Sequence, residues 1–206
     1  MGQSLQIHPQ NPQPRLISQC VNILNKGGII VYPTDSGYAI GCKLDNKNAL
    51  TQICRLRQLD SRHNFTLMCR NLSEIAEYAY LDNPVFRMIK NSTPGHYTFI
   101  LRATKEVPRR IMNKKRKTIG IRLPSNPIAK DLLDGIGEPL LSTSLILPGD
   151  DFAQSSAEEI ESLIGEQVDL IINGGYLSEK PTTVVDLTES TPNIIRVGMG
   201  SLTPFE

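Results

Sequence analysis

Short apolar runs that alternate with amphipathic helical segments constrain the fold of this 206-residue chain most strongly. Residues 15–28 repeat apolar side chains at the spacing of one helical face and then reach two glycines, which stop a helix. Residues 29–35 follow as a short buried strand that ends at Pro33. The same patterns predict helices at 48–59, 83–90, 126–135 and 156–165, and strands at 65–69, 97–103, 118–124, 168–174, 182–188 and 193–198.

The order of these elements predicts the fold class. Helices and strands alternate in the first part of the chain, and strands dominate its end. We therefore expect an α/β protein with a twisted, open, mixed sheet flanked by helices. Because the sequence has no internal repeat and no long linker, we expect a single domain over residues 1–206.

Several helix ends carry their own signals. Asn83 and Asn126 each precede a proline, which is typical of an N-cap followed by proline at the first helical position. Gly135 is expected to stop the helix that follows Asn126. Ser156 and Glu159 have the spacing of a capping box.

The cysteines and the N-terminal segment indicate a compartment. The four cysteines show no C-x-x-C pair and no regular spacing, which indicates free thiols in a reducing environment. The first residues contain no apolar segment of a secretory signal, and no apolar run approaches a membrane span. We expect a soluble, cytoplasmic protein that does not contact membranes.

The charge of the chain is distributed very unevenly. Residues 102–122 carry nine Lys or Arg against one Glu, a net charge of +8, whereas the whole chain carries +1. The remainder is therefore acidic, at −7. This asymmetry predicts one strongly cationic region on an acidic body.

Common catalytic signatures are missing from the sequence. It contains no P-loop, no G-x-G-x-x-G fingerprint and no G-x-S-x-G nucleophile elbow. The three histidines, at 8, 63 and 96, lack the spacing of metal ligands, so we expect no protein-bound metal.

Loops at the ends of the predicted strands are instead rich in hydroxyl groups and arginines. Arg57, Arg122 and Arg196 could each hold a phosphate or a carboxylate, because a guanidinium binds such oxygens through two parallel hydrogen bonds. Neutral donors would come from Thr34, Thr118, Ser142, Ser144 and Thr182. Taken singly, each of these side chains could equally cap local backbone or lie in solvent.

The stretch PLLSTSLILPG (139–149) raises a separate question. Ser142 and Ser144 would face the same side of a strand, where both hydroxyls could line one wall. The next residues, Leu145, Ile146 and Leu147, are apolar where a phosphate site would be expected to place another polar group.

Taken in order, these segments resemble the YrdC/YciO-like threonylcarbamoyl-AMP synthase family. The likeness spans most of the chain, and it is closest to the YciO branch. The resemblance implies a YrdC-like fold with a concave basic face. It also implies synthesis of threonylcarbamoyl-adenylate from L-threonine, bicarbonate and ATP with Mg²⁺, for tRNA modification. The segments that carry the likeness are PTDSGYAIG (33–41), TPGHYTFIL (93–101), TIGIRLPSNP (118–127), KPTTVVDL (180–187) and IIRVG (194–198).

The resemblance assigns roles to individual residues. Thr34, Arg122, Ser142 and Thr182 match positions that hold threonine. Arg57, Thr118, Ser144 and Arg196 match positions that hold ATP. Arg55, Arg57 and Ser144 belong to the catalytic core implied by the family.

This sequence departs from the family at that core. Arg55 stands where the synthases carry the lysine of Lys-x-Arg, and Ile146 where they carry the asparagine of Ser-x-Asn. A later basic residue and histidine align with His63 and Met68, after a gap near residues 59–62. Since isoleucine cannot form a side-chain hydrogen bond, the resemblance implies a weakened synthase.

Two functions stay open at this point. One is a weak or retuned synthase, and the other is a protein that binds tRNA or other structured or double-stranded RNA and has a vestigial or repurposed nucleotide pocket. The second reading depends on a basic run between two strands, which could equally be a solvated loop. The RNA-binding candidates are Arg109, Arg110, Lys114, Lys115, Arg116 and Lys117.

Overall fold

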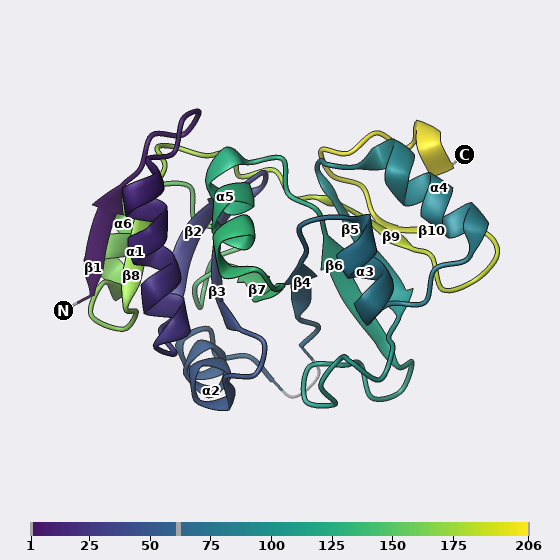
Figure 1. Ribbon diagram of the computed structural model, residues 1–206, viewed down its shortest axis with the longest axis horizontal. Coiled ribbons are helices and arrows are strands. Elements are labelled where there is room, and N and C mark those ends of the chain that lie inside the picture. Colours follow the sequence, from purple (N-terminus) through teal and green to yellow (C-terminus); the bar gives the residue numbers. More distant parts are fainter. Residues whose placement is uncertain (1, 61–62, 206) are drawn as a thin grey trace.

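The computed structural model describes residues 2–60 and 63–205, and its ten strands form one mixed sheet in the order β1-β8-β2-β3-β7-β4-β6-β5-β9-β10 (Figure 1). The strands are β1 (Gln3–Gln6), β2 (Ile30–Thr34), β3 (Gly37–Lys43), β4 (Thr66–Met68), β5 (Tyr97–Arg102), β6 (Thr118–Arg122), β7 (Leu140–Ser144), β8 (Leu170–Asn173), β9 (Thr183–Asp186) and β10 (Asn193–Arg196). The helices are α1 (Pro14–Asn25), α2 (Lys47–Leu56), α3 (Leu72–Tyr78), α4 (Asn83–Ser92), α5 (Pro127–Ile136) and α6 (Ala157–Ile164), with a 3-10 turn at Thr203–Phe205. The predicted helix-flanked mixed α/β sheet is confirmed.

Two hydrophobic cores cover opposite faces of the sheet. Apolar side chains of α1 and α5 pack on β2, β7 and β8, and Figure 1 shows these two helices side by side over that part of the sheet. The other core receives side chains from α2, α3, α4 and α6 and extends across the sheet from β2 to β9. Among the described residues, this first core has no members on β6, β5 and β9, so α1 and α5 leave that part of the sheet face uncovered.

Three elements were not predicted. The strand β3 was expected to be part of a loop at 32–41, β1 is a short polar strand at the edge of the sheet, and α3 has only 7 residues. The β2–β3 hairpin turns through polar residues and Gly37, whose φ is +86°. This polar turn interrupts the apolar run in sequence and conceals the second strand.

Pro33 does not end β2 as expected. It pairs with Tyr38 inside the hairpin. Tyr38 directs its N–H to Gln154 O and its carbonyl to Leu145 N, so both groups bond on the side away from β2. The pair therefore has no mutual hydrogen bonds, and the missing N–H of Pro33 costs the β2–β3 ladder nothing.

Two predicted helix boundaries are shifted. Asp82, and not Asn83, caps α4, because its carboxylate accepts a hydrogen bond from Val85 N at 2.9 Å. The helix α5 continues through Gly135 and is capped by Gly137, whose φ is +75°. A Cβ at Gly135 would lie 2.8 Å from Val21 Cγ2 of α1, so this glycine lets the two helices approach closely. The Asn126 and Ser156 caps are confirmed.

Candidate functional site

A cavity of about 390 Å³ opens on the part of the sheet that α1 and α5 leave uncovered. Its walls come from β4, β5, β6, β7 and β9, from the chain before β4, from the loop that joins β5 to β6, and from β10. No Asp or Glu of the described chain lines it, so it is strongly cationic. The lining includes four arginines (Arg57, Arg116, Arg122 and Arg196) and seven hydroxyl residues (Thr66, Thr98, Thr118, Ser142, Thr143, Ser144 and Thr182).

A row of small residues crosses four strands, and three of its members, Thr66, Gly120 and Ser142, form the floor of the cavity. Gly41 on β3 pairs with Ser142 on β7, Ser142 with Thr66 on β4, and Thr66 with Gly120 on β6. Directly opposed residues point to the same face of a sheet. A Cβ at Gly120 would lie 3.1 Å from Thr66 Oγ1, so the row hollows the sheet where larger residues would fill it.

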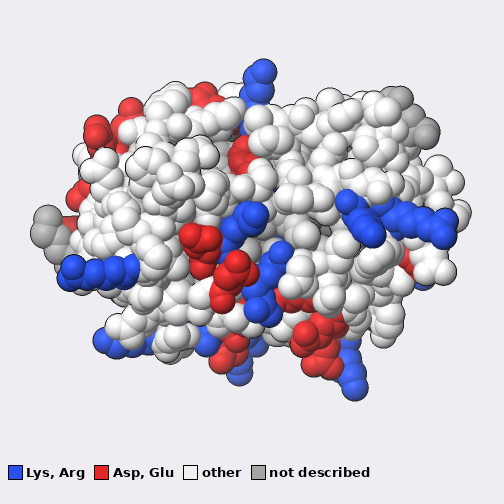
Figure 2. Space-filling view, turned by 45° about the horizontal axis from the view of Figure 1, so that its top comes forward, with Lys and Arg blue, Asp and Glu red and all other residues white. Residues whose placement is uncertain are grey.

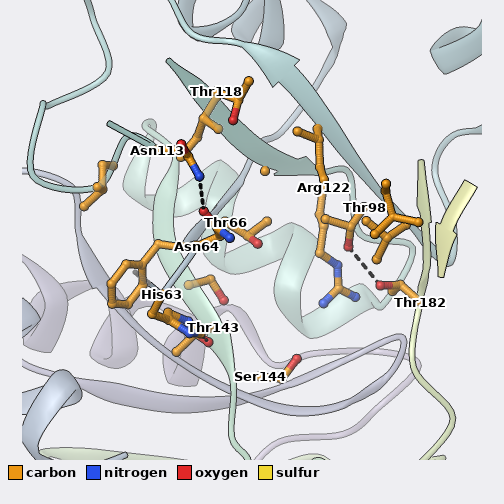
Figure 3. Close-up of a pocket in the computed structure, with 18 of the residues that line it drawn as sticks. His63, Asn64, Thr66, Thr98, Asn113, Thr118, Arg122, Thr143, Ser144 and Thr182 are labelled. Atoms are coloured by element: carbon orange, nitrogen blue, oxygen red, sulfur yellow. Dashed lines mark hydrogen bonds between the residues drawn. The ribbon is translucent and has the colours of Figure 1, made fainter. Parts of the chain in front are cut away.

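Arg122 supplies a buried cation at the end of β6. The residue is 6% exposed, and its Nε and Nη2 atoms have no hydrogen-bond partner in the described part of the chain. Figure 3 shows its guanidinium pointing into the cavity, near the Thr98–Thr182 pair and Ser144. Burial lowers the pKa of Arg122, with the Asp35 carboxylate opposing that shift.

Arg196 and Thr182 form the side of the cavity next to Arg122. Arg196 donates from Nε to Thr182 O at 3.1 Å and from Nη2 to Thr182 Oγ1 at 3.2 Å. The hydroxyls of Thr182 and Thr98 are 2.8 Å apart (Figure 3). These contacts orient the Arg196 guanidinium from strand β10 against the edge of the cavity.

Ser142 keeps a hydroxyl proton that it can donate. Tyr32 donates its own phenol proton to Ser142 Oγ at 2.8 Å. Burial raises the pKa of Tyr32 to about 12, so the phenol stays protonated near neutral pH. The Ser142 hydroxyl therefore accepts from Tyr32 and remains able to donate to another group.

Arg57, Thr143 and His63 form a cluster on the opposite wall. Arg57 donates from Nε to Ile146 O at 2.8 Å and from Nη1 to Thr143 Oγ1 at 2.7 Å. His63 Nε2 lies 3.0 Å from the same Thr143 oxygen (Figure 3). Burial, and then the charge of Arg57, lowers the pKa of His63 to about 4, so the imidazole is neutral at physiological pH.

Most of the residues predicted from the sequence meet in this one cavity. All four of the ATP set line it: Arg57, Thr118, Ser144 and Arg196. Three of the threonine set also line it: Arg122, Ser142 and Thr182. Ser142 and Ser144 share a wall as their spacing predicts.

Thr34 does not contribute its hydroxyl to the cavity lining. The side chain is buried in the β2–β3 turn, where Oγ1 donates to Gly37 O at 2.7 Å and accepts from Ser36 N at 3.2 Å. The threonine holds the turn together. This is the local capping role that a turn hydroxyl often has.

Arg55 and Met68 also lie outside the cavity lining. Arg55 is exposed in the last turn of α2. Two residues along a helix turn a side chain by about 200°, so Arg55 and Arg57 point in nearly opposite directions. Met68 is fully buried in the core with α1 and α5, whereas His63 lines the cavity. Part of the alignment gap near 59–62 lies outside the described residues.

The sequence reasoning did not select Thr143 or Asn113. Thr143 points to the opposite sheet face from Ser142, but it is near the end of β7, where Arg57 and His63 reach its hydroxyl. Asn113 Nδ2 donates to Asn64 Oδ1 at 3.0 Å and links the β5–β6 loop to the chain before β4. These contacts join residues that are 49 to 86 positions apart in the sequence, so no local sequence pattern predicts them.

The basic run lies in the loop that joins β5 to β6. Asn113 Oδ1 accepts hydrogen bonds from the backbone N–H groups of Lys115 and Arg116, so the loop has a defined turn. Arg110 Nη2 donates to Leu44 O at 2.6 Å, and Arg116 forms an ion pair with Asp186 at 2.6 Å. The residues of the run are exposed: Arg109, Arg110, Lys114, Lys115, Arg116 and Lys117.

Charges of both signs are interspersed on the face that Figure 2 shows. Lys and Arg side chains there stand beside Asp and Glu, and uncharged surface separates the groups. On this face the basic residues therefore form no continuous patch.

Two features are absent from the described residues. No helix in them is long and apolar enough to cross a membrane. No group of three or more His, Cys, Asp or Glu in these residues could hold a metal ion. All four cysteines are free thiols, as their spacing predicts.

Known proteins resemble the chain over its whole length. It is 62% identical over 205 residues to YciO of Escherichia coli (strain K12) and 59% identical over 206 residues to a protein of Haemophilus influenzae, and each match covers 100% of both chains. The crystal structure of E. coli YciO superposes with a TM-score of 0.96 and covers 100% of both chains.

More distant structures share the fold. The structure of P. abyssi Sua5 complexed with L-threonine has a TM-score of 0.87 at 22% identity, over 95% of this chain and 57% of that one. The model of the Sua5/YciO/YrdC family, described as "Telomere recombination", matches residues 22–198. Because the family model matches most of the chain and a full-length relative is 62% identical, the chain belongs to the Sua5/YciO/YrdC family.

Proposed function

We propose that this protein binds L-threonine and ATP in the cavity and, with bicarbonate, forms threonylcarbamoyl-adenylate and pyrophosphate for tRNA modification. The observation that carries the proposal is the buried guanidinium of Arg122, which has two N–H-bearing atoms without a partner in the described chain. Leaving a buried charged donor unpaired is costly, so an anionic ligand is the natural partner. The carboxylate of threonine has the required charge and shape.

The neighbours of Arg122 suit the rest of an amino-acid ligand. Ser142 can donate a proton, and the Thr98–Thr182 pair offers hydroxyl oxygens beside the guanidinium. A structural relative, P. abyssi Sua5, was solved in complex with L-threonine. Because the two proteins share the fold, at 22% sequence identity, this complex supports the choice of threonine as the ligand of this chain.

The remaining arginines and hydroxyls suit the phosphates of ATP. Arg57, Thr118, Ser144 and Arg196 lie around the same cavity, so a triphosphate could meet several charges at once. The lining residues that the structure describes include no carboxylate and do not form a magnesium site. Mg²⁺ would therefore arrive with the phosphates of ATP.

The proposed reaction needs positioning more than a protein nucleophile. The threonine amine forms a C–N bond to the carbon of bicarbonate, water leaves, and N-carboxythreonine results. Its carboxylate oxygen then attacks the α-phosphorus of ATP. The new O–P bond forms as the bond to the β-phosphate oxygen breaks, and pyrophosphate leaves with the electron pair. Arginines that neutralise the phosphate oxygens and hold the two reactants in line would accelerate this step.

Pyrophosphate release tests the proposal. The purified protein should release pyrophosphate from ATP only when threonine and bicarbonate are both present. Arg122→Gln should lower the apparent threonine affinity about tenfold to a hundredfold, the loss expected when a charged hydrogen-bond donor is removed. Arg55→Gln removes the same charge outside the cavity and is the control. Release without threonine, or equal threonine affinity in Arg122→Gln, would contradict the proposal.

A second candidate function is binding of structured RNA. The observation that favours it is the exposure of Lys114, Lys115 and Lys117 on a loop that also lines the cavity through Ile111 and Asn113. Changing the three lysines to alanine should flatten the salt dependence of RNA binding by about two to three units of the log–log slope. Binding that does not respond to salt would exclude this function.

A further inference from the structure

Within the described residues, Arg116 is the one arginine of the cavity lining that forms an ion pair with a carboxylate. Its Nη2 atom donates to Asp186 Oδ2 at 2.6 Å and to Thr188 Oγ1 at 3.0 Å. The Arg116 side chain is 49% exposed and that of Asp186 is 7% exposed. The basic β5–β6 loop is thus joined to the buried end of β9 by the Arg116–Asp186 ion pair.

Asp186 is held firmly from its other side. Thr188 donates to Asp186 Oδ1 from its backbone N at 3.0 Å and from its hydroxyl at 2.6 Å. Burial raises the pKa of Asp186, but the hydrogen bonds from Thr188 and Arg116 outweigh it and keep this pKa below its ordinary value. The carboxylate stays charged and in place, so Arg116 is the partner that can move.

Arg116 and Arg122 lie toward different ends of the cavity. Thr118, two residues after Arg116, begins β6, and Arg122 ends it. The Arg116 guanidinium lies at Asp186 on β9, which is in register with Ile100 on β5 and, through it, with Gly120 on β6. Two strand spacings of about 4.8 Å and two residues of about 3.3 Å each therefore separate Asp186 from Arg122. A single phosphate on Arg122 therefore stays far from the Arg116 end, whereas a nucleotide with an extended polyphosphate can occupy both.

We propose that Arg116 is a polyphosphate-binding residue that stays paired with Asp186 until a polyphosphate binds. A ligand with several negative charges draws the guanidinium away from Asp186, and a monophosphate at Arg122 does not. This exchange of partners at Arg116 makes the cavity selective for triphosphates over monophosphates. It rests on the proposed function for its natural ligand, ATP, and it concerns which anion the cavity prefers.

The free-energy change when a phosphate replaces Asp186 at Arg116 is small, so the exchange is reversible. A partly exposed ion pair contributes up to about 1 kcal/mol, which corresponds to about fivefold in affinity. Because a phosphate replaces a carboxylate at the same guanidinium, the ligand gains only the difference between the two contacts. Removing the competing carboxylate should therefore strengthen polyphosphate binding.

Calorimetry with inorganic tripolyphosphate and inorganic phosphate tests this exchange. Asp186→Asn should bind tripolyphosphate about fivefold more tightly than the wild type, with less than a twofold change for phosphate. Glu189→Gln is the matched control, since Glu189 pairs with Arg102 at 3.2 Å and neither residue lines the cavity. It removes one negative charge as well, and its tripolyphosphate affinity should stay within twofold of the wild type.

A second pair of variants covers the case in which Asp186→Asn does not fold. Arg116→Gln should weaken tripolyphosphate binding about fivefold. Lys105→Gln loses one positive charge from the same loop, and Lys105 is exposed and forms no ion pair within the described residues, so this variant should change the affinity less than twofold. If Asp186→Asn equals Glu189→Gln, if Arg116→Gln equals Lys105→Gln, or if neither the wild type nor Asp186→Asn binds tripolyphosphate, the inference is overturned.

The two proposals fail in different measurements. The synthase proposal is decided by threonine affinity in Arg122→Gln and by threonine-dependent pyrophosphate release. The Arg116 exchange is decided by tripolyphosphate affinity in the absence of threonine and bicarbonate. A protein that binds tripolyphosphate through Arg116 but makes no pyrophosphate would retain the second proposal and lose the first.

Discussion

Ile146 stands where the resemblance to the synthases implies an asparagine. Its backbone and its side chain contribute differently to the cavity wall. Its backbone carbonyl accepts the hydrogen bond from Arg57 Nε at 2.8 Å, and the residue lines the cavity. The apolar side chain adds no hydrogen-bonding group to the wall. The backbone at 146 therefore orients an arginine, while its side chain leaves the proposed phosphate region without a polar partner.

Restoring the asparagine should therefore raise the proposed synthase activity. Ile146→Asn is expected to increase threonine-dependent pyrophosphate release about tenfold, which corresponds to about 1.4 kcal/mol of transition-state stabilisation. Arg55→Lys, which completes the Lys-x-Arg pattern, should have no effect, because Arg55 is exposed outside the cavity lining. A folded Ile146→Asn protein that is no faster would argue that the cavity serves another reaction.

His63 should give the protein a specific sensitivity to acid. Its pKa is lowered to about 4 in the folded protein, against an ordinary 6.5. Between these two values the unfolded chain binds a proton at this site that the folded protein does not, so the free energy of unfolding falls as the pH drops from 6.5 and levels off below 4.

Comparison with His63→Asn isolates this effect. Lowering the pH from about 7.5 to 5 should reduce the urea midpoint of the wild type more than that of the variant, because other groups titrate alike in both. Equal losses would mean that the imidazole is solvated in the folded protein.

At the scale of elements, the fit of α5 against α1 depends on Gly135. Alanine favours a helix interior by about 1 kcal/mol over glycine, yet here its Cβ would lie 2.8 Å from Val21 Cγ2. Overpacking of this kind costs about 1–3 kcal/mol, so the clash should outweigh the propensity gain.

The expected result is that Gly135→Ala lowers the free energy of unfolding in urea. The double variant with Val21→Ala should recover part of this loss, since it removes the atom that Cβ would meet. A Gly135→Ala protein more stable than the wild type would show that the helices separate without strain.

At the scale of the whole molecule, the two cores protect most of the thiols. Cys20, Cys42 and Cys69 are buried, and Cys54 is half-buried on α2. Burial raises the pKa of Cys20 and Cys42 to about 12, which suppresses their reactive thiolate forms.

A thiol reagent should therefore label the native protein in two phases. Cys54 reacts first, and the three buried thiols react only as fast as the protein opens. The early phase should disappear in Cys54→Ser. Rapid labelling of more than one thiol in the native protein would contradict this picture of the cores.

Local patterns predicted much of the architecture. The strands at 97–103 and 118–124 and the helices at 83–90 and 126–135 lie close to their observed positions, because apolar periodicity and proline starts are properties of neighbouring residues. β3 and β1 were missed, since a polar hairpin turn and an exposed edge strand depend on pairing with distant strands. Pro33 inside a strand is acceptable only because of where Tyr38 directs its hydrogen bonds.

The sequence by itself determined the mixed α/β class, the family resemblance and seven of the residues that line the cavity. Only the tertiary structure decided which neighbours in sequence share a site: helical phase separates Arg55 from Arg57, and the β2–β3 turn takes the hydroxyl of Thr34. It alone joins Arg116 to Asp186 across 70 residues. Local periodicity shows which face a side chain occupies, but charge pairing depends on distances that arise only when the strands assemble into the sheet.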